Sequence, residues 1–326
     1  MTILVFFYYF CPINHPQEGN MQDSSITLSI LIPTYNQVCV ALVRSLQAQA
    51  EQESDLVYEI LVGDDGSTDP AVLEANEAIN TLPHCRYIIR GVNTGRSAIR
   101  NYLAKEAHYD LLLFIDSHMS VVSNDYIARY LRCRNHDLVY GGYNITKSSV
   151  SAKNNLRLAY ELSCISQQQA EERALSPHAR FHTCNFLVRR EVMLRYPFDE
   201  RFKHYGYEDV LFGKTLKEAG INIFHIDNPL GFNHFESNER FLQKTDEGLQ
   251  TLWDFHDELR GYSRLLTLVE RLKRWHLAWL PRMFFHMTGN TLRRHLTGNH
   301  PTLLAFKAYR LGKMCELARG DLHSNS

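Results

Sequence analysis

Short apolar segments alternate with helical patterns in the first part of the chain, and this alternation constrains the fold more than any other feature. The segments are rich in Val, Ile and Leu: ITLSIL begins at residue 26, YEILV at 58, RYII at 86 and LLLFI at 111. Helices are predicted between them over residues 38–51 and 70–80, the second with Thr68 or Asp69 as N-cap and Pro70 in its first turn. Strands that alternate with helices are typical of a mostly parallel sheet with helices on both faces, so we predict an α/β fold.

The pattern changes after residue 150, where the chain becomes more polar and more helical. A strand and a helix are expected within residues 181–196, a helix closed by Gly220 follows, and a late strand contains His225. From about residue 238 onward the pattern is helical throughout. We therefore divide the chain into a poorly ordered extension (1–24), a catalytic α/β domain (25–240) and a C-terminal helical region (241–326). Met21 directly precedes the first strand, so residues 1–20 are consistent with an upstream start codon.

The composition excludes several classes of protein. Of 326 residues, 44% are hydrophobic and 22% charged, which is ordinary for a globular protein, and a net charge of -1 gives no electrostatic argument for nucleic acid. The seven cysteines are scattered without a C-x-x-C pair, which favours reduced thiols and a cytoplasmic location. The apolar N-terminal stretch is shorter than the roughly 20 residues of a membrane span and lacks the positive charge that begins a secretory signal.

Polar side chains follow three of the predicted strands where each strand ends. Tyr35 and Asn36 come after the first, Asp64 and Asp65 after the second, and Asp116, Ser117 and His118 after the fourth. The carboxyl ends of parallel strands meet at one edge of the sheet, where open α/β sheets bind their ligands. A carboxylate and a neutral imidazole are also good ligands for an ion such as Mn²⁺, so this edge is predicted to bind a ligand and a metal.

Four motifs in this order resemble the nucleotide-sugar glycosyltransferases of family 2, which have the GT-A fold. They are SILIPTYN, ILVGDDGSTD, NTGRSAIRN and LLLFIDSHM, and the resemblance covers roughly residues 26–240. It implies a nucleoside site and arginines that offset the pyrophosphate charge, although each arginine taken singly is as compatible with a solvated helix position. The nucleotide-binding residues implied are Pro33, Tyr35, Asp64, Asp65, Arg96, Arg100 and Asp116.

The metal motif departs from the D-x-D that is usual in the family. Here it is D-x-H, as in the polypeptide N-acetylgalactosaminyltransferases, and the late GFNHFE segment is similar to one in chondroitin-polymerase-like members. The resemblance implies a divalent metal site formed by Asp116, His118 and His234. This mixed set of nitrogen and oxygen ligands suits Mn²⁺ better than Mg²⁺. His225 lies inside an apolar strand and is expected to be a packed core residue.

The segment YGYEDV matches the acceptor side of the family's site. There an E-D pair begins a helix, and the resemblance implies that Asp209 is the general base while Glu208 hydrogen-bonds the acceptor. Asn185, in TCNFLVRREV, is expected nearest the substrates on the acceptor side. Retaining relatives with D-x-H do not keep an Asp in this role, so the pair favours an inverting, single displacement.

The function implied is transfer of a sugar from a UDP-sugar to a saccharide acceptor, free or lipid-linked, in polysaccharide or glycoconjugate biosynthesis. One alternative is a catalytically degenerate sugar-nucleotide binding protein. Another is a sugar-phosphate nucleotidyltransferase, although the loop PTYNQVCV lacks the glycines expected there.

Residues 264–296 carry an apolar stripe with seven basic residues around it and one acid, Glu270. The stripe must be buried, either against the catalytic domain or as peripheral contact with an anionic membrane.

Overall fold

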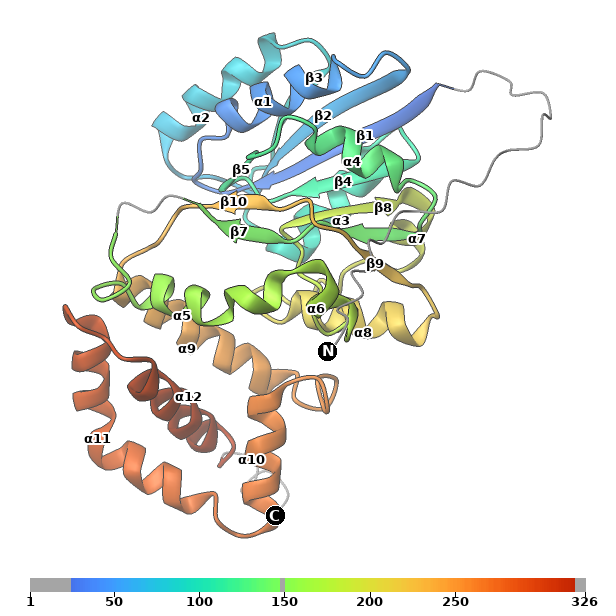
Figure 1. The fold of residues 1–326 in the computed structure, drawn as a ribbon. Helices are drawn as coiled ribbons and strands as arrows, with labels where there is room; N and C mark the ends of the chain where they lie inside the picture. Colours follow the sequence, from blue (N-terminus) through green and yellow to red (C-terminus); the bar gives the residue numbers. More distant parts are fainter. Residues whose placement is uncertain (1–24, 147–149, 320–326) are drawn as a thin grey trace, which may run out of the picture.

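The computed structural model describes residues 25–146 and 150–319, and the predicted extension at residues 1–24 lies outside them. A central seven-stranded sheet has the order β3-β2-β1-β4-β8-β6-β9 (Figure 1). Strands β3, β2, β1 and β4 run parallel to one another, as do β6 and β9, while β8 runs antiparallel to both β4 and β6. The strands of this sheet are β1 (Ile26–Thr34), β2 (Leu56–Asp64), β3 (Cys85–Ile89), β4 (Leu111–Ile115), β6 (Leu138–Tyr140), β8 (Asn185–Arg189) and β9 (Ile223–His225).

Helices cover both faces of the sheet, as the alternation of strands and helices predicts. Successive residues of β4 face opposite sides, so Leu113 packs in the cluster under α1 and α4 while Phe114 packs in the cluster under α3, α7 and α8. Both side chains are fully buried. The helices are α1 (Val40–Ala50), α2 (Pro70–Glu77), α3 (Arg96–Glu106), α4 (Tyr126–Arg132), α7 (Arg190–Arg195) and α8 (Glu208–Glu218), with a short 3₁₀ turn η1 (Ala78–Thr81).

Local sequence signals place several of these boundaries. Helix α2 begins with Pro70, and the Asp69 side chain caps it by accepting the backbone N–H of Ala71 at 3.0 Å. Helix α8 ends shortly before Gly220, which has φ of +73°, a conformation that other residues adopt only at a cost.

The sequence predicts one strand, followed by a loop, in the late segment that contains His225, and the structure differs. It forms two strands, β9 in the main sheet and β10 (Leu230–Phe232) in a small second sheet with the order β5-β10-β7. Its other members are β5 (Met119–Ser120) and β7 (Tyr143–Ile145). The chain between β9 and β10 turns at Asp227, Asn228 and Pro229, which sequence periodicity does not detect because each strand has only three residues. The second sheet brings the residues after Phe232 beside the end of β4.

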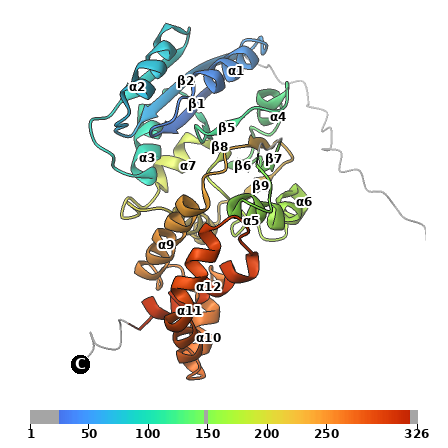
Figure 2. The same ribbon diagram turned by 90° about the vertical axis from the view of Figure 1, so that its left-hand side faces the viewer.

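The C-terminal region is helical, as predicted, and extends away from the sheet (Figures 1 and 2). Its first helix crosses the predicted boundary at residue 241, and it packs against α5 with a core of its own that includes Leu242 and Phe306. The helices are α9 (Asn238–Asp254), α10 (Arg264–Arg274), α11 (Trp279–Thr297) and α12 (Leu303–Leu317); between the sheets and these lie α5 (Leu156–Cys164), η2 (Ile165–Gln168) and α6 (Ala170–Ala174).

Candidate active site

The loops after β1 and β2 are joined by hydrogen bonds centred on Asn36. Its side-chain oxygen accepts the backbone N–H groups of Thr68 and Asp69 at 2.9 and 3.1 Å, and its own N–H donates to Ser67 Oγ at 2.7 Å. Asn36 has φ of 49°, in the left-handed region that Asn tolerates better than most residues. This arrangement leaves the neighbouring Tyr35 side chain 47% exposed at the edge of the sheet.

The two acids after β2 are both buried, and protein donors already bind them. Asp64 accepts the Tyr87 hydroxyl at 2.6 Å and the Ser67 N–H at 2.7 Å. Asp65 accepts the Thr94 hydroxyl and the Gly95 N–H, each at 2.8 Å. Their visible role is to shape the loops that surround the predicted nucleoside site.

A buried arginine joins the end of β4 to the start of α8. Arg100 Nη2 donates to Asp116 Oδ1 at 2.8 Å, and Nη1 lies 3.5 Å from Glu208 Oε1. Burial alone would raise the pKa of Asp116, but Arg100, His118 and Arg96 together outweigh it, and the pKa lies below its usual range. Burial and the adjacent Asp209 raise the pKa of Glu208, against the effect of Arg96 and Arg100. Asp116 and Glu208 therefore share the guanidinium of Arg100 as an ion-pair partner, and the charge of Arg96 acts on both.

The proposed metal ligands are of suitable types but do not form a complete site. Burial lowers the pKa of His118, with Asp116 opposing the shift, so the imidazole is neutral at pH 7 and can bind a metal. The antiparallel pair Phe232–Met119 places the chain leading to His234 beside His118, and the His234 side chain is exposed. Over residues 25–146 and 150–319, however, no cluster of three or more His, Cys, Asp or Glu is arranged to hold a metal ion.

The E-D pair begins α8 after two residues with positive φ, Gly206 and Tyr207. Asp209 Oδ2 lies 3.0 Å from Nδ1 of His182, and its Oδ1 accepts the backbone N–H of Val210 at 2.8 Å. The Asp209 side chain is 20% exposed, so it remains accessible to a substrate. Sequence reasoning did not identify His182, because it comes from the loop before β8 and matches none of the four motifs.

Comparison with known proteins identifies the family of this site. Residues 29–196, just over half of the chain, match the family description "Glycosyl transferase family 2". The chain belongs to glycosyltransferase family 2. Its mostly parallel sheet with helices on both faces is the GT-A fold, as predicted.

Relatives of this glycosyltransferase share only part of its length or little of its sequence. It is 24% identical over 245 residues to a chondroitin synthase of Pasteurella multocida, a match that covers 65% of this chain and 25% of the synthase. An uncharacterized glycosyltransferase of Haemophilus influenzae is 26% identical, over 61% of this chain and 75% of that protein. The mannosyltransferase PcManGT of Pyrobaculum calidifontis, solved with GDP-Man and Mn²⁺, has a TM-score of 0.52 at 14% identity, over 92% of this chain and 88% of that chain.

Asn185 has a different place in the glycosyltransferase from the one predicted. Its side chain is 0% exposed, and its amide makes all four of its hydrogen bonds within the protein. It accepts the hydroxyls of Tyr126 and Tyr130 at 2.6 and 2.7 Å and donates to the carbonyls of Gly142 and Asn228 at 2.6 and 2.9 Å. Asn185 therefore links α4, the end of β6 and the turn before β10 from a buried position.

Arg157 and Lys244 add positive charge around the site to that of the predicted Arg96 and Arg100. Arg96 stacks over the ring of Tyr205 at 4.6 Å, and Lys244 of α9 approaches the same ring at 5.7 Å. Arg157 of α5 packs on Phe232 at 5.3 Å. Arg96, Arg157 and Lys244 all depress the pKa of His118, so the positive potential around that ring comes from α3, α5 and α9 together. The helices that carry Arg157 and Lys244 contain none of the recognised motifs, so the sequence did not predict that these two residues contribute to the potential around His118.

His225, expected in the core, is buried there. Its Nδ1 accepts from Arg173 Nη1 at 3.0 Å and its Nε2 donates to the Pro177 carbonyl at 3.1 Å. Burial, with the charge of Arg173, lowers the pKa of His225 to about 4.

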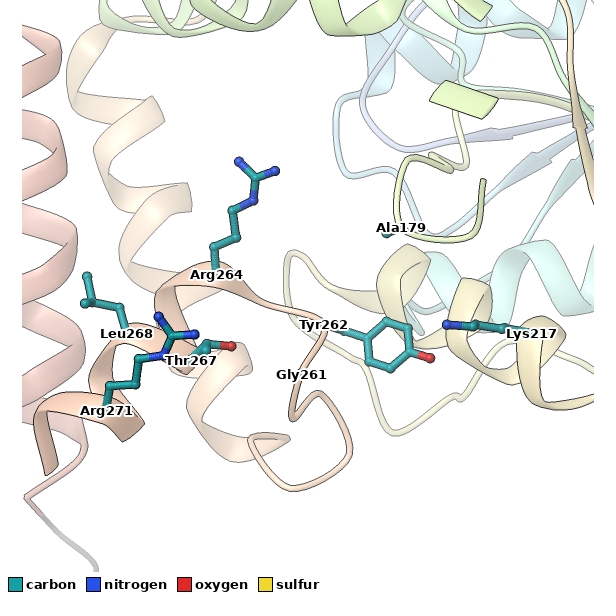
Figure 3. Close-up of a pocket in the computed structure, with 8 residues that line it drawn as sticks. All are labelled: Ala179, Lys217, Gly261, Tyr262, Arg264, Thr267, Leu268 and Arg271. Atoms are coloured by element: carbon teal, nitrogen blue, oxygen red, sulfur yellow. The ribbon is translucent and has the colours of Figure 1, made fainter. Parts of the chain in front are cut away.

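A separate cavity of about 500 Å³ lies away from the strand ends, between the C-terminal end of α8 and α10. Its lining residues include Lys217, Tyr262, Arg264 and Arg271 (Figure 3).

The buried guanidinium generates the first prediction. Arg100→Met should destabilise the protein by about 3–5 kcal/mol, because it removes the ion-pair partner of the buried Glu208 and of the largely buried Asp116. Arg86→Met is the matched control, since Arg86 pairs with Glu106 at the surface and should contribute at most about 1 kcal/mol. Urea unfolding of the two variants at pH 7 measures the difference. Equal stability losses would contradict the role given to Arg100.

Proposed function

We propose that this glycosyltransferase moves a sugar from a UDP-sugar to a saccharide acceptor with inversion at the anomeric carbon, in a metal-dependent reaction. The observation that carries the proposal is the chain Asp116–Arg100–Glu208, which fixes the D-x-H motif and the E-D pair on either side of one buried cation. Support for a nucleoside diphosphate donor comes from PcManGT, which was solved with GDP-Man. Support for polysaccharide synthesis comes from the chondroitin synthase relative.

In the proposed reaction the donor's base lies between the loops after β1 and β2. Tyr35 covers the base, while Pro33, Asp64 and Asp65 shape the surface beneath it. Arg96 offsets the charge of the diphosphate by charge-assisted hydrogen bonds. Arg100 acts indirectly, since its guanidinium is only 2% exposed and is committed to two acids.

Asp209 removes the acceptor proton in this proposal, and Glu208 orients the acceptor hydroxyl. The acceptor oxygen forms its bond to the anomeric carbon while the bond to the diphosphate oxygen breaks and its electron pair leaves with the nucleoside diphosphate. Asp209 suits this role because it is partly exposed at the start of α8, whereas Glu208 is buried. The intact Asp209 also favours catalysis over a degenerate binding module.

Asp116, His118 and His234 are the residues that would hold the metal. Asp116 has Oδ2 available, since Arg100 binds Oδ1, and the neutral His118 ring can serve as the second ligand. A mixed oxygen and nitrogen set suits Mn²⁺ better than Mg²⁺. When bound, a divalent ion would neutralise the charge of the leaving diphosphate as a Lewis acid.

A membrane is the proposed location of the acceptor, because the corner between α10 and α11 exposes large apolar side chains. None of the helices in the described ranges combines the length and apolar character of a membrane span. Leu265 and Leu272 pack inward, but Trp275 and Trp279 are 64% and 48% exposed, and the predicted stripe divides between the two helices. The corner lies at the end of the molecule far from the sheet (Figures 1 and 2).

Basic residues surround this corner, which favours an anionic bilayer as its partner. The one acid of residues 264–296, Glu270, is paired with Arg260 at 3.3 Å. Each Lys or Arg near an anionic surface adds about 1 kcal/mol of attraction, and Trp side chains favour headgroup depth. The basic residues of α10 and the start of α11 are Arg264, Arg271, Lys273, Arg274 and Arg282.

The base assignment is tested with Asp209→Asn. Turnover of the most active donor from a panel of UDP-sugars should fall by about two to four orders of magnitude, the usual contribution of a general base. UDP binding in the presence of Mn²⁺, measured by calorimetry, should change little because the substitution preserves shape. Near-normal turnover by the purified variant would exclude Asp209 as the base. Pyrophosphate release from a nucleoside triphosphate and a sugar phosphate would instead support a nucleotidyltransferase.

The metal assignment is tested with His118→Ala and His234→Ala. Because even the loss of an outer-shell partner costs about 10- to 100-fold in metal affinity, each variant should weaken Mn²⁺-dependent UDP binding at least about tenfold. His225→Ala is the control: it should keep that affinity and lose about 1–3 kcal/mol of stability through unsatisfied buried groups. Unchanged calorimetric affinity in either test variant would show that the residue is not a ligand.

Membrane contact is tested by flotation with vesicles of phosphatidylcholine alone or mixed with phosphatidylglycerol. The protein should float with the anionic vesicles at low salt, and a Trp275→Glu/Trp279→Glu double variant should not. Leu304→Glu is the control, because Leu304 is 80% exposed on α12 rather than at the corner. If wild-type protein binds neither vesicle, or if Leu304→Glu is as impaired as the double variant, the corner is not a membrane surface.

A further inference from the structure

The proposed base has a side-chain partner that no family motif predicts. His182 lies in the loop before β8, between Phe181 and Thr183, which are both buried. Its Nδ1 is 3.0 Å from Asp209 Oδ2, while the ring itself is 42% exposed. Its buried neighbours anchor the backbone on both sides, so the imidazole is held against the carboxylate while part of the ring remains accessible.

The geometry restricts the orientation of Asp209. Oδ2 is bound by the imidazole and Oδ1 by the backbone N–H of Val210, so the carboxylate is held at both oxygens from two different elements. Each oxygen keeps a further lone pair for a substrate hydroxyl. Helix α8 itself provides a donor for Oδ1 only, and the donor for Oδ2 comes from His182 in a different element.

We propose that His182 is a positioning residue for the base Asp209, and that the charge on its ring sets the lower pH limit of the reaction. The inference rests on the proposed function, in which Asp209 takes the acceptor proton. In the active form a neutral imidazole donates its Nδ1–H to Oδ2. The acceptor proton then passes to Asp209 as the new bond to the anomeric carbon forms and the electron pair of the broken bond leaves with the nucleoside diphosphate.

The electrostatic surroundings give the direction of the pH effect. Partial burial disfavours the charged imidazole, but the hydrogen bond and negative charge of Asp209 outweigh it, so the pKa of His182 is raised above its usual range. The other titratable or charged groups that face the ring are Glu161 of α5, Arg173 of α6, Tyr140 of β6, Tyr143 of β7 and His225 of β9.

The sign of the effect follows from the two protonation states of the ring. Above the raised pKa the ring is neutral and Asp209 is an effective base. As the pH falls through that pKa, an imidazolium forms beside Asp209 and lowers the affinity of the carboxylate for the acceptor proton. Activity is therefore expected above this pKa and lost below it.

The decisive experiment compares His182→Asn with His182→Ala. The Asn amide can donate from about the position of Nδ1 but cannot become charged. His182→Ala should lower kcat about 10- to 100-fold at pH 8 with a smaller change in KM, as losses of a supporting hydrogen bond do. His182→Asn should recover most of that loss. Its acid limb in kcat/KM should move at least about one unit lower than in the wild type, because no imidazole can then become charged beside Asp209.

A matched control is available at the other end of the sheet. His108, on the loop before β4, forms the same type of pair: its Nδ1 lies 2.9 Å from Glu59 Oε2, compared with 3.0 Å for His182 and Asp209. His108→Asn should change neither kcat nor the acid limb. If His182→Asn behaves like His108→Asn, or if its acid limb coincides with that of the wild type, the proposal is overturned.

A measurement without turnover separates this inference from the proposed function. The histidine ring signals in NMR titrations, with His182 assigned from His182→Asn, should give a pKa for His182 that falls in Asp209→Asn. An unchanged pKa would show that the two side chains do not interact in solution and would overturn the inference. An active Asp209→Asn enzyme would instead refute the base assignment, whatever the titration shows.

Discussion

The guanidinium of Arg100 is the interaction on which the rest of the site depends. It lies in α3, yet it bonds to Asp116 at the end of β4 and lies within ion-pair distance of Glu208 at the start of α8. Without this cation the buried Glu208 and the largely buried Asp116 would lose their ion-pair partner, and desolvation would favour their protonated forms. Arg100 thus contacts both the D-x-H motif and the E-D pair, which are far apart in the sequence, and the nearby charge of Arg96 acts on the same two acids.

The site is completed by elements outside the strand–helix repeat that defines the fold. Strand β10 pairs with β5 and so brings the chain before His234 beside His118, and α9 contributes Lys244. The loop before β8 contributes His182, which holds Asp209 from the side. In the proposed function, the parallel half of the sheet provides the edge for the donor's nucleoside, the second sheet brings the metal ligand His234 beside His118, and the start of α8 provides the acceptor side.

The C-terminal helices serve two different surfaces. The inner faces of α9 and α12 pack against α5 and against each other, so this region supports α5 and the elements beside it. At the corner between α10 and α11, Trp275 and Trp279 are exposed, although α10 itself packs against α12 and Lys273 lies over the ring of Trp253. If a bilayer binds this corner, as proposed, the C-terminal helices separate the membrane surface from the site at the ends of the strands.

The sequence by itself determined the fold class, the family and the residue types at the strand ends. Buried parallel strands leave a strong local signal, since the run Leu111–Ile115 must be apolar on both faces and must end where polar groups begin. The E-D pair and the N-cap Asp69 are likewise local features.

Only the tertiary structure decided what each polar side chain contacts. Asn185 and Arg100 occur in recognisable motifs, but burial turned one into a support for the sheet and the other into an internal counter-ion. His182 was invisible in the sequence because its role depends on a contact with Asp209, 27 residues away, that exists only once β8 and α8 have packed together.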